Sequence, residues 1–89
     1  MSTKFNKKLD LQRLQRLADE LAEYGSGDLT NLMHRWETEE KAKIDGNPAS
    51  GRVARCRLAG ITSTCTSGQQ GAVRNWGQAA RRAILKAAA

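Results

Sequence analysis

Apolar residues recur every three or four positions along two stretches of the N-terminal half, the spacing of one face of an α-helix. In the first stretch they are Leu11, Leu14, Leu17, Ala18, Leu21 and Tyr24, and in the second Leu29, Leu32, Met33, Trp36 and Ile44. We predict helices over about residues 9–24 and 28–45. Asp10 and Asp28 are suited to cap them, and Gly25 to end the first. Because the connector is short, the two helices are expected to form an antiparallel hairpin.

A third apolar stripe lies near the C-terminus. Its members are Val73, Trp76, Ala80, Ile84 and Ala87. Ser67 and Gln70 form the S-x-x-Q pattern of a capping box, so we predict a helix over about residues 68–87. Gly71 and Gly77 lower its helix propensity, by about 1 kcal/mol each relative to alanine. They indicate places where another backbone packs closely against this helix.

Residues 51–66, between the second and third helices, fit two structures. In one, apolar residues alternate with Arg55 and Arg57, as in a strand with one basic face, and Gly60 turns the chain into a second strand. In the other, a short helix over residues 50–59 ends at Gly60 and an extended segment follows.

We favour the second structure for this segment. The expected fold is therefore mainly α, with an antiparallel helical hairpin packed against a basic C-terminal helix. A short irregular or extended segment lies between them.

The composition limits what kind of protein this is. With 89 residues the chain suits one small domain over residues 9–89, after a flexible basic arm over residues 1–8. Only 4% of the residues are aromatic, so we expect Trp36 and Trp76 in the core rather than stacked on a base. No apolar run approaches the ~20 residues of a membrane span, and no secretory signal is recognisable. We expect a cytoplasmic protein with reduced cysteines.

The charge is divided unevenly along the chain. There are 15 Lys and Arg against 9 Asp and Glu, for a formal net charge of +6. Residues 1–45 hold eight of the basic residues and all nine acidic ones, whereas residues 46–89 hold seven basic residues and no acidic one. Such an asymmetry indicates an anionic partner for the C-terminal half.

Nucleic acid is the partner that this charge favours. Arginine binds phosphate through a planar fork of donors, which permits bidentate contacts. We predict a small, non-catalytic protein that binds DNA or RNA through the phosphate backbone, with the basic arm as an auxiliary contact. The candidate binding residues are Arg52, Arg55, Arg57, Arg74, Arg81, Arg82 and Lys86.

Other uses of the basic half stay open. Its arginines would be neutralised internally if they paired with Asp19, Glu20 and Glu23 across the fold. The chain would otherwise suit a small interaction or inhibitor protein, of the kind found in phages and mobile elements, that docks on an acidic protein surface. It would also suit a structural subunit of a larger particle. The two charge poles further permit a homo-oligomer.

The acidic residues are accounted for by local pairing within the predicted helices. Opposite charges four residues apart are neighbours on a helix surface and contribute about 0.2–0.5 kcal/mol each. The pairs with this spacing are Glu37–Lys41, Glu39–Lys43 and Arg16–Glu20.

Metal binding and catalysis find no support in the sequence. His34, Cys56 and Cys65 lack the spacing of a zinc site, since there is no C-x-x-C and no second histidine. No phosphate-binding glycine motif is present, and the one histidine is far in sequence from a candidate nucleophile. We expect no enzyme activity, no metal and no cofactor.

Overall fold

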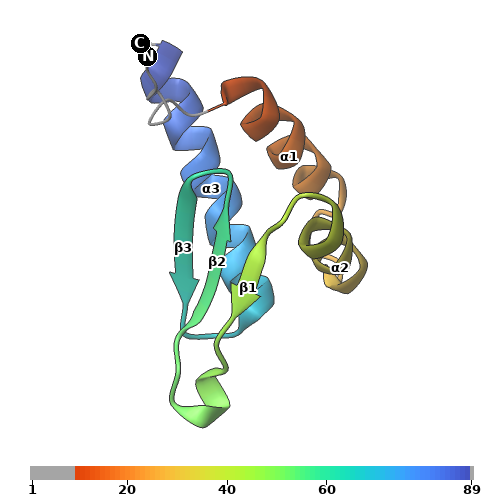
Figure 1. The fold of residues 1–89 in the computed structure, drawn as a ribbon, viewed down its shortest axis with the longest axis vertical. Helices are drawn as coiled ribbons and strands as arrows, with labels where there is room; N and C mark the ends of the chain where they lie inside the picture. Colours follow the sequence, from red (N-terminus) through yellow and green to blue (C-terminus); the bar gives the residue numbers. More distant parts are fainter. Residues whose placement is uncertain (1–9, 89) are drawn as a thin grey trace.

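The structure, a computed structural model, describes residues 10–88. It contains three α-helices and one antiparallel sheet (Figure 1). The helices are α1 (Leu11–Glu23), α2 (Thr30–Glu39) and α3 (Gln69–Ala88), and the strands are β1 (Lys43–Asp45), β2 (Ala54–Leu58) and β3 (Ile61–Cys65). A short 3₁₀ helix, Pro48–Ser50, lies between β1 and β2. The fold mixes helices and strands, so the expectation of a mainly α fold is right only in part. The predicted arm over residues 1–8 lies outside the described residues.

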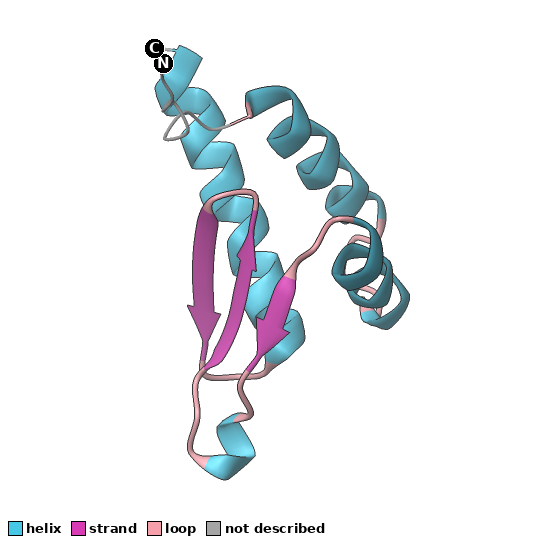
Figure 2. Cartoon of the chain, in the orientation of Figure 1, coloured by secondary structure: helices cyan, strands magenta, loops and turns pink. Residues whose placement is uncertain are grey.

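The sheet and α3 form two layers. β2 is the central strand, with β1 and β3 on either side (Figure 2). The inner face of β1 and β2 is buried against the core, and its residues are Ile44, Ala54, Cys56 and Leu58. α3 packs against all three strands and also against α1. The opposite face of the sheet is therefore left on the outside.

The prediction of a helix over residues 50–59 is wrong, and the strand that was set aside is present. Buried and exposed residues alternate along β2, which places Arg55 and Arg57 on the outer face. β2 pairs with β1 on one side and with β3 on the other, and these two pairings hold it in an extended conformation. Tertiary contact of this kind overrides the local propensity of a short segment.

The second helix is shorter than predicted, because it ends at Glu39 rather than near residue 45. Lys41 adopts a left-handed backbone conformation with φ of 62° and turns the chain into β1. Ile44 is buried as expected, but it lies on a strand. Lys41 and Lys43 are therefore not on a helix, and within residues 10–88 neither forms the ion pair predicted with a glutamate. The pair of Arg16 with Glu20 does form, at 4.0 Å.

α1 and α2 do not lie side by side as an antiparallel hairpin. Figure 1 shows α2 nearly along its axis, whereas α1 runs across the view beside α3 and in the opposite direction to it. Gly77 allows this close approach, since a Cβ atom there would collide with the side chain of Leu21. A Cβ atom at Gly71 would likewise meet Cys65. Both glycines thus permit close packing, but against side chains rather than against another backbone as predicted.

The predicted caps are confirmed for α1 only. The Asp10 carboxylate accepts a hydrogen bond from the backbone N–H of Arg13 at 3.1 Å, and the helix ends just before Gly25. Asp28 does not cap α2, because it accepts from the side chains of Thr30 and Gln70 instead. Since Gln70 reaches across to the beginning of α2, the capping box predicted for α3 is wrong.

Two tryptophans form the centre of the core, as predicted. The rings of Trp36 and Trp76 are fully buried and meet edge to face, with their centroids 5.3 Å apart. Both indole N–H groups are satisfied: Trp36 donates to Glu20 at 3.0 Å, and Trp76 donates to the backbone carbonyl of Leu58 at 3.0 Å. The pair therefore joins α2 to α3, and its hydrogen bonds reach α1 and β2.

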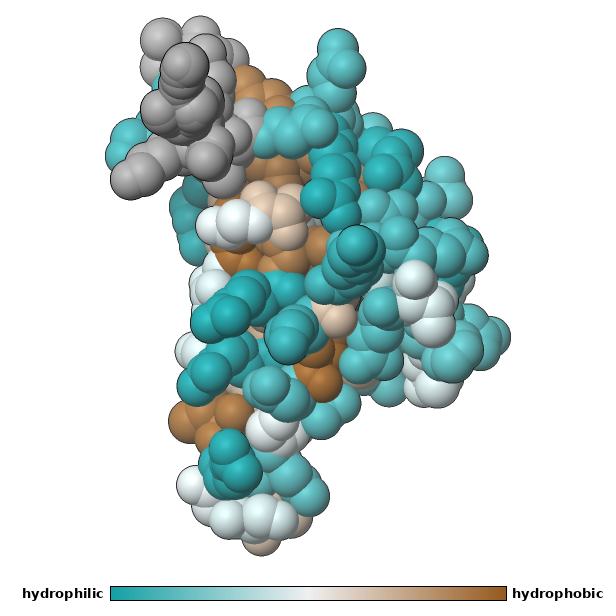
Figure 3. Space-filling view, in the orientation of Figure 1, coloured by the Kyte–Doolittle hydropathy of each residue, from teal (hydrophilic) through white to brown (hydrophobic). Residues whose placement is uncertain are grey.

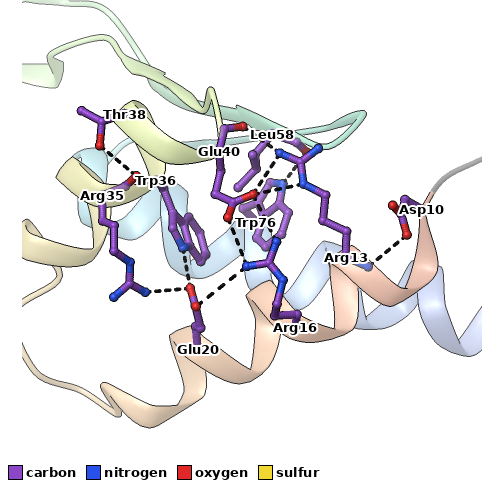
Figure 4. Close-up of polar contacts among 10 residues, drawn as sticks. All are labelled: Asp10, Arg13, Arg16, Glu20, Arg35, Trp36, Thr38, Glu40, Leu58 and Trp76. Atoms are coloured by element: carbon purple, nitrogen blue, oxygen red, sulfur yellow. Dashed lines mark hydrogen bonds and ion pairs between the residues drawn. The ribbon is translucent and has the colours of Figure 1, made fainter.

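Two glutamates connect α1 to α2 through ion pairs (Figure 4). The Glu40 carboxylate accepts from Arg13 at 3.2 Å and from Arg16 at 3.1 Å. Arg13 also donates to the backbone carbonyl of Glu40, at the point where α2 ends. Glu20 accepts from Arg35 at 2.8 Å. This network fixes the end of α2, and hence the direction in which β1 begins.

We predict that Glu40 makes stability depend on acid pH. Hydrogen bonds from Arg16 and Arg13 lower the pKa of Glu40 below its ordinary value of 4.5. Its contribution is therefore complete above that value and is lost as the pH falls through the lower pKa of the folded state. Glu40→Gln should reduce the free energy of unfolding by about 1–2 kcal/mol at neutral pH. Urea unfolding between pH 7 and pH 3 checks this, and an unchanged difference between wild type and variant across that range would contradict it.

The turn between β2 and β3 offers a stabilising substitution. It has two residues, Ala59 and Gly60, with φ of 53° and 84°, the signs of a type I′ turn. Alanine is strained there, and Asn-Gly is the favoured sequence. Ala59→Asn should raise the midpoint of thermal unfolding by about 4 °C or more, for a gain near 1 kcal/mol. A lowered midpoint would contradict this. It would show that the packing of the alanine methyl group stabilises the fold by more than the relief of backbone strain in the variant.

Candidate nucleic-acid interface

The outer surface of the sheet carries two rows of exposed polar side chains. The pairing register sets Lys43 beside Arg57 and Arg57 beside Thr62, and it sets Asp45 beside Arg55 and Arg55 beside Thr64. All six residues are exposed. We call them the sheet face: Lys43, Asp45, Arg55, Arg57, Thr62 and Thr64. Figure 3 views this side of the molecule, where hydrophilic side chains gather over the strands.

The cations of the sheet face have no internal partner among the residues that the structure describes. The ion pairs of residues 10–88 all join groups within the first 45 positions, to Glu20 and Glu40. None reaches Arg55 or Arg57, and no side-chain hydrogen bond within this range does so. The ion pairs within residues 10–88 thus leave the C-terminal arginines unpaired, and the proposed neutralisation by Asp19, Glu20 and Glu23 is not formed.

Like charges lie next to one another in this cluster. Lys43 and Arg57 are directly opposite across β1 and β2, an arrangement that lowers the stability of a sheet. Asp45 is opposite Arg55, yet the two do not approach within the 4.0 Å of an ion pair. The guanidinium group of Arg55 thus keeps its donors for an external partner.

Two further cations border the sheet face. Lys41 lies at the end where β2 turns into β3, and it lines a shallow depression of about 440 Å³ together with Lys43 and Arg57. Arg52 lies in the loop before β2 and is exposed. The positive surface therefore continues past both ends of the strand pair.

Arg74 and Arg81 lie elsewhere, on the side of α3 that meets α1. The guanidinium group of Arg74 donates to the backbone carbonyls of Gly25 and Gly27, in the connector after α1. Arg81 donates to the carbonyl of Ala18 at 3.3 Å. The structure does not bring these two arginines together with the sheet face, and their prediction as binding residues stays untested.

Arg82 and Lys86 are exposed on a different side of α3. They are seven and eleven residues beyond Asn75, whose side chain donates to the carbonyl of Thr64 at 2.8 Å. With helical periodicity these positions share the side of α3 that borders β3. The C-terminal end of α3 continues past the β2–β3 turn (Figure 1). This pair forms a second basic area next to the first.

The cysteines are not part of either area. Both are free thiols; Cys56 is buried on the inner face of β2, where burial raises its pKa to about 12. Hydrogen bonds with the side chain and the backbone of Ser67 lower the pKa of Cys65. Within residues 10–88 no three metal-ligating side chains gather at one place.

The sequence analysis missed the contribution of Lys41, Lys43 and the two threonines. Both lysines had been assigned to a helix surface, paired with glutamates. The signal that identifies them is the alternation of residues 41–45, in which Lys41, Lys43 and Asp45 are exposed around buried neighbours. Such alternation is typical of a strand with one buried face.

Comparison of the chain with the known protein families, with curated proteins and with solved structures finds no match. None of the helices within residues 10–88 combines the length and apolar character that crossing a membrane demands. What the sheet face does must therefore be argued from its own chemistry.

We predict that Arg74 stabilises the fold. Replacing it leaves two backbone carbonyls without their donor, so Arg74→Ala should lower the free energy of unfolding by about 1–2 kcal/mol. The matched control is Arg82→Ala, which removes the same charge from an exposed position and should change stability by less than about 0.5 kcal/mol. Urea unfolding of both variants measures the difference, and equal values would contradict the anchoring role.

Proposed function

We propose that this protein binds nucleic acid without catalysis, through contacts between the sheet face and the phosphate backbone. The observation that supports the proposal best is the grouping of Lys43, Arg55 and Arg57. These side chains are exposed, they have no ion-pair partner among residues 10–88, and α3 packs against the opposite side of their sheet. An anionic ligand would relieve the repulsion between Lys43 and Arg57.

The donors of this surface match phosphate chemistry. Two arginine forks lie in the middle, and Lys43, Lys41 and Arg52 surround them. Thr62 and Thr64 add hydroxyl groups, which also bond phosphate oxygens. Arg82 and Lys86, on α3, lie outside this surface and serve as the comparison site.

An acidic protein surface is the competing partner, and the composition of the sheet face speaks against it. The cores of protein–protein interfaces are enriched in aromatic and other apolar residues, whereas interfaces with nucleic acid are more polar and more positive. All six residues of the sheet face are polar or charged, and none is aromatic. The face therefore resembles the second kind of interface more than the first.

The proposal predicts binding that weakens steeply with salt. Five cations, three in the sheet face and two at its borders, would release about 0.9 counterion each. A plot of the logarithm of the association constant against the logarithm of the salt concentration should then have a slope of about −4.5. Affinity should then fall about 500-fold between 50 and 200 mM salt. Fluorescence anisotropy with labelled DNA and RNA at several salt concentrations measures the slope.

A matched pair of variants places the binding site. Arg55→Gln with Arg57→Gln removes two charges from the sheet face, and Arg82→Gln with Lys86→Gln removes two from α3. The double variant of the sheet face should make the slope of the salt dependence less negative by about two, and the double variant of α3 by less than about one. Far-ultraviolet circular dichroism verifies that both variants are folded.

Two outcomes would overturn the proposal. An equal reduction of the salt slope in the two double variants would show that the binding area is not centred on the sheet face. Absence of binding to every nucleic acid at 50 mM salt would leave an acidic protein as the partner, and capture on an immobilised acidic peptide would then be expected.

A further inference from the structure

The sheet face has no platform on which an unpaired base could stack. None of the six residues of the sheet face has an aromatic ring. Among residues 10–88, Trp36 and Trp76 are fully buried, Tyr24 is half-buried against the core, and His34 lies on α2. Proteins that bind single strands usually combine a basic groove with aromatic rings that stack on successive bases. A basic face without rings is better matched to a duplex, whose bases are already stacked on one another.

The sheet face spans three strands, and its central strand carries its two arginines. Lys43 and Asp45 lie beside them on β1, and short threonines lie beside them on β3. Strands are about 4.8 Å apart, so the backbone of the sheet spans about 10 Å from β1 to β3. The major groove of B-form DNA is about 12 Å wide, enough to receive the exposed side chains of the central strand. The major groove of an RNA duplex is too narrow and deep for side chains to read.

Asp45 gives the face a feature that phosphate binding alone does not explain. Its carboxylate lies opposite Arg55 on the exposed surface, where it would repel a phosphate backbone. In the major groove, however, a carboxylate accepts a hydrogen bond from the amino group of cytosine, and arginine donates to O6 and N7 of guanine. Adjacent aspartate and arginine side chains thus match the two bases of G·C pairs.

We infer that the sheet face binds double-stranded DNA with β2 in the major groove, where Arg55 and Arg57 donate to guanine and Asp45 accepts from cytosine. The inference rests on the proposed function and narrows it to one ligand and one groove. The charges of both arginines still neutralise phosphates beside the groove, and Lys41, Lys43 and Arg52, around them, contact the phosphates on either side.

The spacing of the arginines sets the scale of the recognised site. Residues two apart on a strand are separated by about 6.8 Å, and base pairs rise by about 3.4 Å. The two guanidinium groups therefore reach base pairs within about two steps of each other. The favoured duplex is one with guanines at neighbouring or next-neighbouring positions.

The first experiment compares ligands of one G·C-rich sequence by competition in fluorescence anisotropy. A DNA duplex should bind at least about tenfold more tightly than the corresponding RNA duplex or either single strand. Equal or tighter binding of the RNA duplex would overturn the choice of DNA, and tighter binding of a single strand would overturn the duplex.

The second experiment distinguishes the grooves with modified DNA duplexes. Replacing guanine by 7-deazaguanine removes the N7 acceptor from the major groove, whereas replacing it by inosine removes only the amino group in the minor groove. The first change should weaken binding by about fivefold or more, and the second should leave it within about twofold. The reverse order would place the protein in the minor groove and overturn the inference.

A charge-conserving variant separates base contacts from phosphate contacts. Arg55→Lys with Arg57→Lys retains both positive charges but loses the bidentate forks. The variant should keep the salt slope of the wild type and lose the preference for guanine over 7-deazaguanine. A retained preference would show that these arginines do not read the bases.

The failures of the two proposals are distinguishable. Steep salt-dependent binding that is indifferent to 7-deazaguanine and to the kind of strand would leave the proposed function standing and refute the groove assignment. Absence of binding to all of these ligands at low salt would refute both.

Discussion

The arrangement of this small domain depends on the contact between Trp36 and Trp76. Their rings meet edge to face at 5.3 Å, a geometry that places the positive edge of one ring against the negative face of the other. Each indole N–H is bonded in turn, Trp36 to Glu20 on α1 and Trp76 to the carbonyl of Leu58 on β2. The second bond holds the end of the β2–β3 hairpin against the middle of α3. In a chain with so few aromatic residues, this pair fixes which face of the sheet is inside.

Once the inner face of the sheet is fixed, no further interaction is needed to place its charged side chains on the outer face. Side chains alternate between the faces of a strand, so burial of Cys56 places Arg55 and Arg57 outside. The clamp of Glu40 by Arg13 and Arg16 ends α2 and sets the direction of β1, which brings Lys43 beside Arg57. Two carboxylates of the acidic half, Glu20 and Glu40, thus hold helices together. The cations across the sheet are left without partners within the part of the chain that the structure describes.

The sequence was sufficient for elements defined by local periodicity and insufficient for those defined by pairing. α1, with its cap at Asp10, and the apolar stripe of α3 follow from spacings of three and four residues. The three strands are only three to five residues long, and a segment such as Lys43–Asp45 becomes a strand because β2 lies beside it. For the site, Arg55 and Arg57 were predictable from their alternation with apolar residues. Their neighbour Lys43 was not, since its assignment to a helix surface was locally consistent.

The net charge indicated which half of the chain carries the candidate interface. It does not show which arginines bond within the fold and which remain exposed. Arg74 and Arg81 are seven residues apart on the face of α3 that meets α1, where backbone carbonyls take up their donors. Arg82, one residue further, is turned by about 100° and is exposed. Helical phase therefore separates Arg74 and Arg81, which bond to backbone carbonyls of α1 and its connector, from the exposed Arg82. Strand alternation in turn places Arg55 and Arg57 on the exposed face of the sheet. It is the geometry of the elements, rather than the count of charges, that makes the sheet face the strongest candidate for an anionic ligand.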